Sequence, residues 1–237
     1  GEQFNLTDQK IQKLKYSSRL IAKIDNNLIQ DGYQLYIHNF ILSEKGDFCV
    51  IQQGLNPENR YARRYHWLSF KIKDFIIEPH TAVCCNQWGT PLNLTLKQNE
   101  QIRKISVDLA NEKNLKNLIM SRKHEIDLKR FEPLENLQNF APKNYEQLVM
   151  VKGVGPKTIR ALALISKLIY KAELVKKEPP QQFAFAHGGK DGYPRPIDRT
   201  EYNRSIQILH AAIENAKLGN KEKLKALRRL NEFAPSL

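Results

Sequence analysis

The sequence predicts an α+β protein, in which a small, mainly antiparallel sheet flanked by helices is followed by an all-helical part. Three observations support this fold class. Residues 7–30 carry apolar side chains at helical spacing, residues 31–85 are rich in aromatic and β-branched residues, and helical spacing returns after residue 95. The predicted domains are a helix-plus-sheet domain at 1–95, a helical connector at 96–143 and a helical domain at 144–237.

The first domain begins with a helix that Thr7 can cap and that the Asp31-Gly32 pair ends. A turn at 43–46 separates two runs of aromatic and β-branched residues, which predicts a β-hairpin. A further segment at 81–85 is left undecided. The strands expected in this domain are 33–42, 47–53, 65–71 and 74–78.

The remaining chain is expected to be helical, with an irregular link at 131–143 and a loop at 183–196. Asp198 and Glu201 form a capping box at the start of one helix. The helices expected after the sheet are 97–111, 113–124, 144–151, 158–170, 198–217 and 221–233.

The net charge of +13 is unevenly distributed. Residues 151–237 hold 17 Lys or Arg against 8 Asp or Glu, whereas residues 1–150 hold 21 against 17. A basic region of this kind favours nucleic acid over an acidic protein or a membrane surface. No apolar run approaches the roughly 18 residues of a membrane span. The three cysteines form no C-x-x-C pattern, so we expect reduced thiols in a cytoplasmic protein.

The connector KGVGPK at 152–157 lies between two of the predicted helices. We expect its two glycines to turn the backbone with positive φ, and Pro156 suits the first position of a helix. The N–H groups at the start of the second helix would then face one point and bind an anion. The residues expected to bind nucleic acid here are Lys152, Gly153, Gly155, Lys157, Thr158 and Arg160.

This connector, with apolar residues alternating with glycines and a basic residue after them, resembles the helix-hairpin-helix family. The resemblance implies binding of DNA backbone phosphates without base reading, and no catalytic group in the motif. It predicts that Gly155→Val weakens DNA binding strongly, because a β-branched residue resists positive φ. The alternative is a packing corner between two helices, whose lysines bind nothing.

The predicted sheet carries polar residues that can be arranged as a nuclease site. Asp31, followed by Gln52 on a later strand, loosely resembles the acid and Glu/Gln-x-Lys pair of restriction-enzyme-like nucleases, although the lysine is missing. Mg²⁺ or Mn²⁺ is the expected cofactor, with Asp31 and Glu78 as ligands. Arg63 or Arg64 would contact the scissile region. The alternative is that Asp31-Gly32 only ends a helix and that Gln52 is a hydrogen-bonded strand residue.

Three other groups carry both a functional and a plain interpretation. In ARRYHW (62–67), cations and aromatics suit phosphate contact and base stacking, or else Tyr65 and Trp67 pack inward and the arginines pair with acids. The loop residues can form a phosphate-binding nest or a structural turn; they are His187, Gly188, Gly189 and Lys190. A histidine trio can bind metal or lie in the core and surface; its members are His38, His66 and His80.

Five stretches of this chain are similar to an archaeal and bacterial family labelled only as a domain of unknown function. They are QDGYQLYIHNF (30–40), VIQQGLN (50–56), ARRYHWLS (62–69), EPHT (78–81) and FAFAHGGKDGYP (183–194). The resemblance implies no particular activity. Its members are usually longer at the N-terminus, which implies that this chain lacks an N-terminal region.

These observations predict a DNA-binding protein of DNA maintenance and repair, with metal-dependent cleavage of branched, nicked or single-stranded DNA as the expected activity. Besides DNA, a repair or helicase protein is an expected partner. Lys221, Lys225 and Arg228 share one face of the last helix and are expected to continue the phosphate track. The leucines expected to be buried on another face are Leu224, Leu227 and Leu230. The alternatives are a non-catalytic module that recruits an enzyme, and an enzyme that acts on a small phosphorylated substrate through the His187 loop.

Overall fold

The computed structural model describes residues 5–85, 87–112, 137, 140–180, 182–183, 199–216 and 219–233. The chain divides into two compact units, residues 1–184 and residues 185–237. The domain boundaries predicted at residues 95 and 143 stay predictions. The predicted helix at 113–124, the Asp198 cap and the loop at 187–190 lie outside the described residues.

The first unit begins with helix α1 (Asp8–Asn27), and Thr7 caps it as the sequence predicts. The Thr7 hydroxyl oxygen accepts the N–H of Lys10 at 3.3 Å. The helix ends earlier than expected, because β1 (Ile29–Gln30) follows it and pairs antiparallel with β6 (Leu92–Asn93). The apolar face of α1 is fully buried at Leu20, Ile21 and Ile24.

The main sheet has five strands in the order β2-β3-β4-β5-β7. The strands are β2 (Gln34–Leu42), β3 (Phe48–Leu55), β4 (Ala62–Leu68), β5 (Ala82–Cys84) and β7 (Gln182–Phe183). The first four pair antiparallel, which confirms the predicted sheet and the β2–β3 hairpin. β7 was not predicted, and it adds to β5 in parallel.

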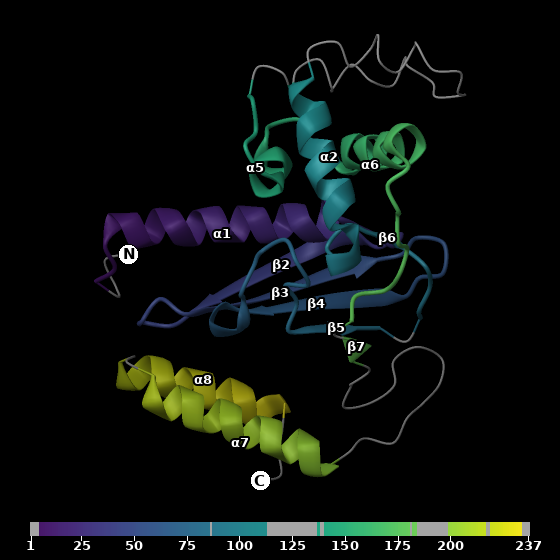
Figure 1. Cartoon of the computed structure of the whole chain (residues 1–237). Helices are drawn as coiled ribbons and strands as arrows, with labels where there is room; N and C mark the ends of the chain where they lie inside the picture. Colours follow the sequence, from purple (N-terminus) through teal and green to yellow (C-terminus); the bar gives the residue numbers. More distant parts are fainter. Residues whose placement is uncertain are drawn as a thin grey trace. The chain divides into compact units, whose positions relative to one another are not determined.

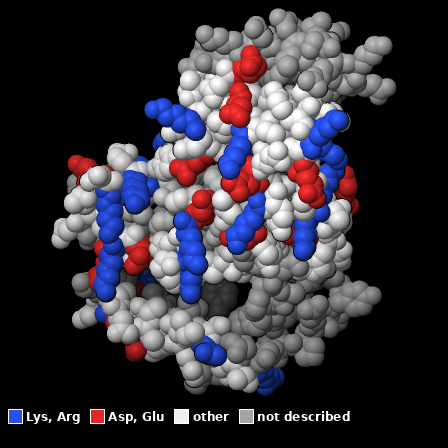
Figure 2. Space-filling model, viewed as in Figure 1, with Lys and Arg blue, Asp and Glu red and all other residues white. Residues whose placement is uncertain are grey.

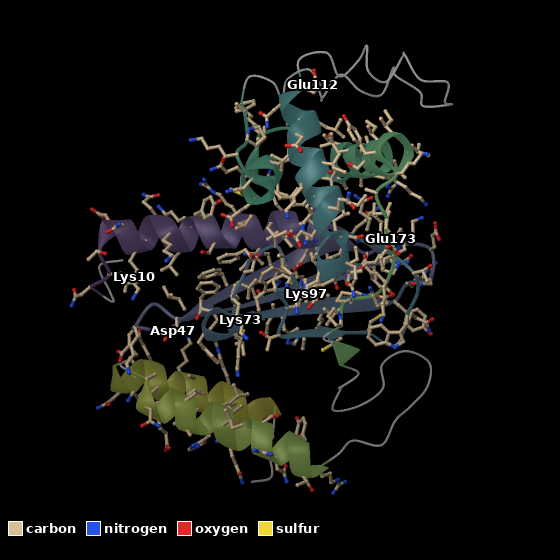
Figure 3. The ribbon with its side chains drawn as sticks, viewed as in Figure 1. Lys10, Asp47, Lys73, Lys97, Glu112 and Glu173 are labelled. Carbon is tan, nitrogen blue, oxygen red and sulfur yellow. The ribbon has the colours of Figure 1, made fainter. Side chains whose placement is uncertain are left out.

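The turn of the β2–β3 hairpin lies close to the first turn of α1. Gly46 has a φ of 84°, a conformation that favours glycine. Lys10 donates to the carbonyl of Lys45 in this turn. Figure 3 shows Lys10 at the start of α1 and Asp47 just after the turn. This contact holds the far end of the hairpin to the helix that covers the sheet.

Residues 74–78 do not form the strand that their composition predicts. The Asp74 carboxylate accepts the N–H groups of Ile76 at 2.6 Å and Ile77 at 2.8 Å, which bends the backbone into a turn. Glu78 then has a φ of 44°, in the left-handed region. An aspartate that bonds its own downstream backbone competes with strand pairing, so the prediction was wrong here.

Three described helices complete the first unit: α2 (Glu100–Asn111), α5 (Tyr145–Met150) and α6 (Pro156–Tyr170). In Figure 1, α1 lies over one face of the sheet. α5 and α6 pack on α1, and α2 packs on both of them. One apolar core runs through these helices and the sheet, from Val50 and Trp67 to Leu148 and Leu162. The described residues therefore form the predicted α+β fold.

The second unit contains α7 (Arg199–Asn215) and α8 (Asn220–Phe233), which pack on each other. The described residues of this unit include few buried side chains, among them Ile206. In the part of the chain that the structure describes, no helix has the length and apolar character needed to cross a membrane.

Candidate functional site

The connection between α5 and α6 is a short turn on a fixed apolar base. The N–H of Val154 donates to the carbonyl of Val151 at 3.2 Å, and both side chains are buried. Lys152 and Gly153, which lie between them, are exposed. The two buried valines therefore anchor the backbone of the turn, while its tip at Lys152 and Gly153 stays accessible.

The two glycines of this turn differ in conformation. Gly153 has a φ of 90°, which favours glycine as the sequence predicts. Gly155 caps α6 with a φ of −129° and a ψ of −175°, an extended conformation that any residue adopts. A Cβ atom added at either glycine would meet nothing within 4 Å. The strain expected from Gly155→Val is therefore wrong, and the argument applies to Gly153.

Side chains of α1 and β1 bind the carbonyl groups of the turn. Lys23 Nζ donates to the carbonyls of Val149 at 2.9 Å and Val151 at 2.8 Å, and burial lowers the pKa of this lysine. Gln30 Nε2 donates to the carbonyl of Pro156 at 2.7 Å. The carbonyls of Val149, Val151 and Pro156 therefore have hydrogen-bond donors, and these bonds hold the turn in place against α1 and β1.

The start of α6 has the features of an anion site. Gly155 gives no side-chain cap, so in the described residues the amides of Lys157 and Thr158 have no capping acceptor. The side chains of Lys152, Lys157 and Arg160 are exposed, while that of Thr158 is buried. Amide groups at a helix start and neighbouring cations both attract phosphate. The structure therefore brings the predicted binding residues of this turn together.

A buried ion cluster joins two predicted site residues, Asp31 and Arg63, to Glu178, which the sequence did not indicate. Arg63 Nη1 lies 2.7 Å from Asp31 Oδ2 and 2.8 Å from Glu178 Oε2. Arg63 Nη2 donates to Glu178 Oε1 at 3.1 Å and to the carbonyl of Gln87 at 2.9 Å. Tyr65 donates to Asp31 Oδ2 at 2.6 Å. Arg63 is thus a partner of acids, which is the plain interpretation of this arginine.

Burial and charge act in opposite directions on this cluster. Burial raises the pKa of Asp31, against the lowering effects of Arg63 and Tyr65. Burial alone would lower the pKa of Arg63, but Asp31 and Glu178 raise it above its ordinary value. The guanidinium therefore stays charged, and the cluster of one cation and two carboxylates carries a net negative charge when both acids are ionised.

A cavity of about 320 Å³ lies beside this cluster. Its walls include Asp31, Arg63 and Glu178, together with Tyr33, Asn59 and Trp88. Trp88 is 43% exposed. Three of the stretches that carry the family resemblance, at 30–40, 50–56 and 62–69, each contribute residues to this cavity. Trp88 and Glu178 were missed, because neither belongs to a sequence motif.

Gln30 connects the cavity to the start of α6. It lines the cavity, donates through Nε2 to Pro156 at 2.7 Å, and accepts the Nε–H of Arg160 at 2.5 Å through Oε1. Gln30 therefore lines the cavity and also bonds Arg160, one of the exposed cations of the turn. This juxtaposition could not be read from the sequence, because Gln30 and Arg160 are 130 residues apart.

Gln52 belongs to a different cluster, centred on the buried Asp25. Asp25 Oδ2 accepts Gln52 Nε2 at 2.5 Å and Trp67 Nε1 at 2.9 Å, and Asp25 Oδ1 lies 2.5 Å from His80 Nε2. Gln52 Oε1 in turn lies 2.8 Å from His38 Nδ1. This is the hydrogen-bonded strand glutamine of the plain interpretation. Trp67 is fully buried, as is Tyr65, so the predicted base stacking on them is wrong.

The remaining residues predicted for catalysis or metal binding do not gather around Asp31. The Glu78 carboxylate lies 3.2 Å from Lys97 Nζ, and the exposed Arg64 donates to Gln53 at 2.9 Å. Over the described ranges, no group of three or more His, Cys, Asp or Glu is placed to hold a metal ion. The expected Mg²⁺ or Mn²⁺ at Asp31 and Glu78, and the histidine site, stay predictions without support from these contacts.

The cationic face predicted on the last helix is exposed, and we call Lys221, Lys225 and Arg228 the basic face of α8. The leucines opposite are less buried than expected. Leu224 is 52% exposed, while Leu227 and Leu230 are half-buried. In the described residues of this unit, only α7 offers a helix for them to pack on, which explains the partial burial.

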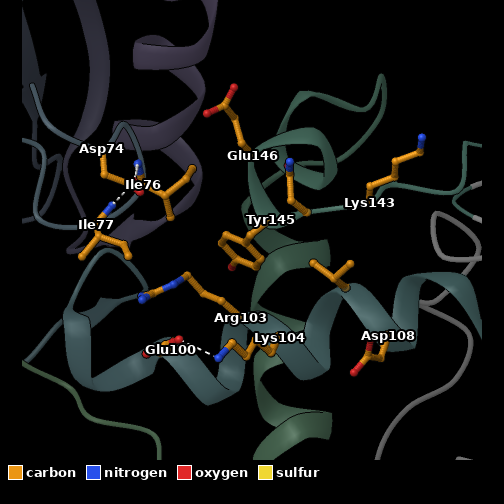
Figure 4. Close-up of a pocket in the computed structure, with 12 residues that line it drawn as sticks. Asp74, Ile76, Ile77, Glu100, Arg103, Lys104, Asp108, Lys143, Tyr145 and Glu146 are labelled. Atoms are coloured by element: carbon orange, nitrogen blue, oxygen red, sulfur yellow. Dashed lines mark hydrogen bonds and ion pairs between the residues drawn. The ribbon is translucent and has the colours of Figure 1, made fainter.

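A second cavity, of about 450 Å³, lies between α2 and the start of α5. In Figure 4 the hydroxyl end of Tyr145 points toward the Arg103 side chain. Arg103 Nη1 donates to the carbonyls of Leu94 at 2.8 Å and Leu96 at 2.6 Å. Its Nη2 and the Tyr145 hydroxyl are buried without a hydrogen-bond partner among the described residues. Burial lowers the pKa of Arg103 and raises that of Tyr145.

Comparison with known proteins gives one match. A family model described as "Protein of unknown function (DUF763)" matches residues 1–197. No curated protein and no solved structure matches the chain. The matched range contains the α5–α6 turn, the Asp31 cluster and both cavities, and it confirms the resemblance to a domain-of-unknown-function family.

Proposed function

Since the chain belongs to the family described as "Protein of unknown function (DUF763)", whose description names no activity, we propose from its geometry that it binds nucleic acid, and DNA foremost, through backbone phosphates at the α5–α6 turn. In this proposal the turn is a helix-hairpin-helix motif. Its role is to hold DNA during maintenance or repair, next to a repair enzyme or helicase.

The observation that carries this proposal is the uncapped start of α6 beside three exposed cations. Phosphate oxygens accept hydrogen bonds, so they can bond the amides of Lys157 and Thr158. Lys152, Lys157 and Arg160 add attraction that does not depend on base sequence.

The charge distribution favours a local contact over a broad basic surface. On the face shown in Figure 2, Lys and Arg are interspersed with Asp and Glu. At the turn, by contrast, exposed cations coincide with amides that lack a capping acceptor, so both attract a phosphate there. A single contact of this size binds weakly, so we include the basic face of α8 as a second contact to the backbone.

Of the three classes of function that the sequence left open, the nuclease and the binding module both use DNA, and between these two the contacts favour a binding module. Backbone binding needs only the turn and its cations. Cleavage needs ligands for a divalent metal, and the described residues hold no group of three or more His, Cys, Asp or Glu placed to bind one. Incubation of DNA with the protein and Mg²⁺ or Mn²⁺ distinguishes the classes: cleavage that Asp31→Asn abolishes while binding persists would establish the nuclease.

The test of the proposal is fluorescence anisotropy of labelled duplex and single-stranded DNA over a range of salt concentrations. Replacing Lys152, Lys157 and Arg160 by Ala should weaken binding by more than about tenfold and lower the salt slope by about 0.9 for each lost phosphate contact. The matched control removes three exposed lysines elsewhere, Lys13, Lys15 and Lys167. Equal effects of the two triple variants would show that only net charge matters, and would refute the proposal.

A further inference from the structure

The cavity beside Asp31 has a charge that disfavours phosphate. Its Arg63 guanidinium already binds the carboxylates of Asp31 and Glu178, at distances between 2.7 and 3.1 Å. The cluster of two acids and one cation carries no spare positive charge. A phosphate placed there would meet no net positive charge, and a net negative charge when both acids are ionised, whereas a neutral group meets no such penalty.

The lining of the cavity includes an aromatic ring on which a flat group can stack. The Arg63 guanidinium lies 4.5 Å from the centre of the Tyr33 ring and 5.7 Å from the centre of the Trp88 ring. Trp88 leaves 43% of its surface exposed on the cavity wall. Unstacked bases stack on aromatic rings, and Trp88 is the exposed ring of this lining. A volume of about 320 Å³ accepts one base with room for its sugar edge.

One hydrogen-bond donor in this lining has no protein acceptor. Arg63 is 2% exposed, and its Nε atom is buried without a partner among the described residues. A buried N–H without an acceptor is costly, but this atom is closed to the cavity in the described structure, so an acceptor of a ligand reaches it only after a local shift. Ring nitrogens and carbonyl oxygens of bases are such acceptors. The amide side chain of Asn59 lies on the same wall and offers a further polar contact.

The position of the cavity fits a base whose phosphate is held at the turn. Gln30 lines the cavity and bonds both Pro156 and Arg160 at the start of α6. A single nucleotide presents a charged phosphate and a neutral ring at its two ends. The turn offers a cationic surface for the phosphate, and the cavity offers a largely polar wall with the exposed Trp88 ring for the base.

We propose that this cavity binds one unstacked nucleobase of the nucleic acid whose backbone contacts the α5–α6 turn, with Trp88 as its stacking surface. The inference rests on the proposed function for the phosphate contact, and adds to it the substrate class: single-stranded nucleic acid, or a duplex with an unpaired base. Extrusion of a base from an intact duplex breaks its pairing and stacking, so unpaired bases enter first.

Trp88 gives a direct spectroscopic test. The chain has two tryptophans, and the other, Trp67, is fully buried. Nucleosides without phosphate should quench the Trp88 emission in a saturable way, while ribose 5-phosphate, which lacks a base, should not. Trp88→Phe should remove the quenching. Quenching that remains in this variant, or no quenching by any nucleoside, would overturn the assignment of the cavity.

Oligonucleotides separate this inference from the proposed function. Single-stranded DNA should bind more tightly than an oligonucleotide of equal charge in which every base is replaced by an abasic site. The expected preference is roughly 5- to 150-fold, the range for stacking of one base. Trp88→Ala should abolish the preference, and Trp88→Phe should keep part of it. The control is Phe70→Ala, because Phe70 is 69% exposed and does not line the cavity.

The outcomes distinguish the two claims. DNA binding that depends on Lys152, Lys157 and Arg160 but ignores Trp88 would overturn the base site and leave the proposed function standing. Nucleoside quenching without any binding of oligonucleotides would overturn the proposed function, and with it the claim that the base comes from nucleic acid.

Discussion

The Asp31 cluster, in which Arg63 binds Asp31 and Glu178, gives a prediction whose magnitude follows from the structure. In Arg63→Met, an apolar side chain of similar length replaces the guanidinium and leaves Asp31 and Glu178 facing each other without a cation. The side chains of Arg63 and Asp31 are each 2% exposed, and that of Glu178 is 6% exposed, so water cannot take over its role. Loss of one member of a buried ion pair costs about 3–5 kcal/mol. For a unit of this size that corresponds to a fall in Tm of roughly 6–20 °C.

The assay is urea unfolding followed by tryptophan fluorescence. Both tryptophans, Trp67 and Trp88, lie in the first unit, so the signal reports that unit without α7 and α8. The matched control is Arg64→Met on the same strand, where the side chain is exposed and should change the free energy of unfolding by less than about 0.5 kcal/mol. A loss below about 1 kcal/mol in Arg63→Met would refute the buried, coupled cluster.

The pH dependence of the same variant checks the cause. Without the guanidinium, which lowers it, the folded-state pKa of Asp31 rises further above the unfolded value, since burial already raises it. A carboxyl with a raised folded pKa costs stability in full above that pKa, and the cost disappears as the pH falls through it. The difference in stability between Arg63→Met and the parent should therefore shrink from pH about 7 to pH about 4. A difference that stays constant would point to lost packing instead of charge.

The turn, the second cavity and the second unit each add a prediction. Gly153→Val should lower the free energy of unfolding of the first unit by about 1–2 kcal/mol, measured by urea unfolding, and should weaken DNA binding, measured by anisotropy. Gly155→Ala should change neither quantity. Tyr145→Phe should leave the free energy of unfolding within about 0.5 kcal/mol of the parent or raise it, because it removes a buried hydroxyl without a described partner; a larger loss in urea unfolding would reveal a partner. Reversal of the basic face of α8 to Glu should weaken DNA binding by more than about tenfold at moderate salt with little change in Tm, and parental affinity would contradict this.

Local patterns predicted the elements whose stability is local. The Thr7 cap, the hairpin turn at Gly46 and the proline at the first position of α6 each follow from the preference of one residue for one backbone conformation. The strand predicted at 74–78 failed for a local reason too, since the Asp74 carboxylate bonds the backbone two and three residues ahead. Hydrophobic spacing alone does not register such a side-chain contact.

The candidate site was harder to predict, because its contacts join distant parts of the chain. Arg63 meets Glu178 across 115 residues, and no spacing rule connects them. The sequence also predicted base stacking by the aromatics of ARRYHW (62–67), but Tyr65 and Trp67 turn inward from β4, and it missed Trp88 in a loop. Asp31 and Arg63 were predicted as catalytic residues, and their contacts now place them in the wall of a cavity.

Amide resonances report directly whether phosphate binds at the start of α6. In a titration of ¹⁵N-labelled protein with a short DNA, followed by NMR, the amides of Lys157 and Thr158 should shift most in the first unit, together with those of Gly153 and Gly155. These shifts should disappear at high salt, as backbone contacts do. DNA binding that leaves these four amides unmoved, while resonances elsewhere in the first unit shift, would contradict the account.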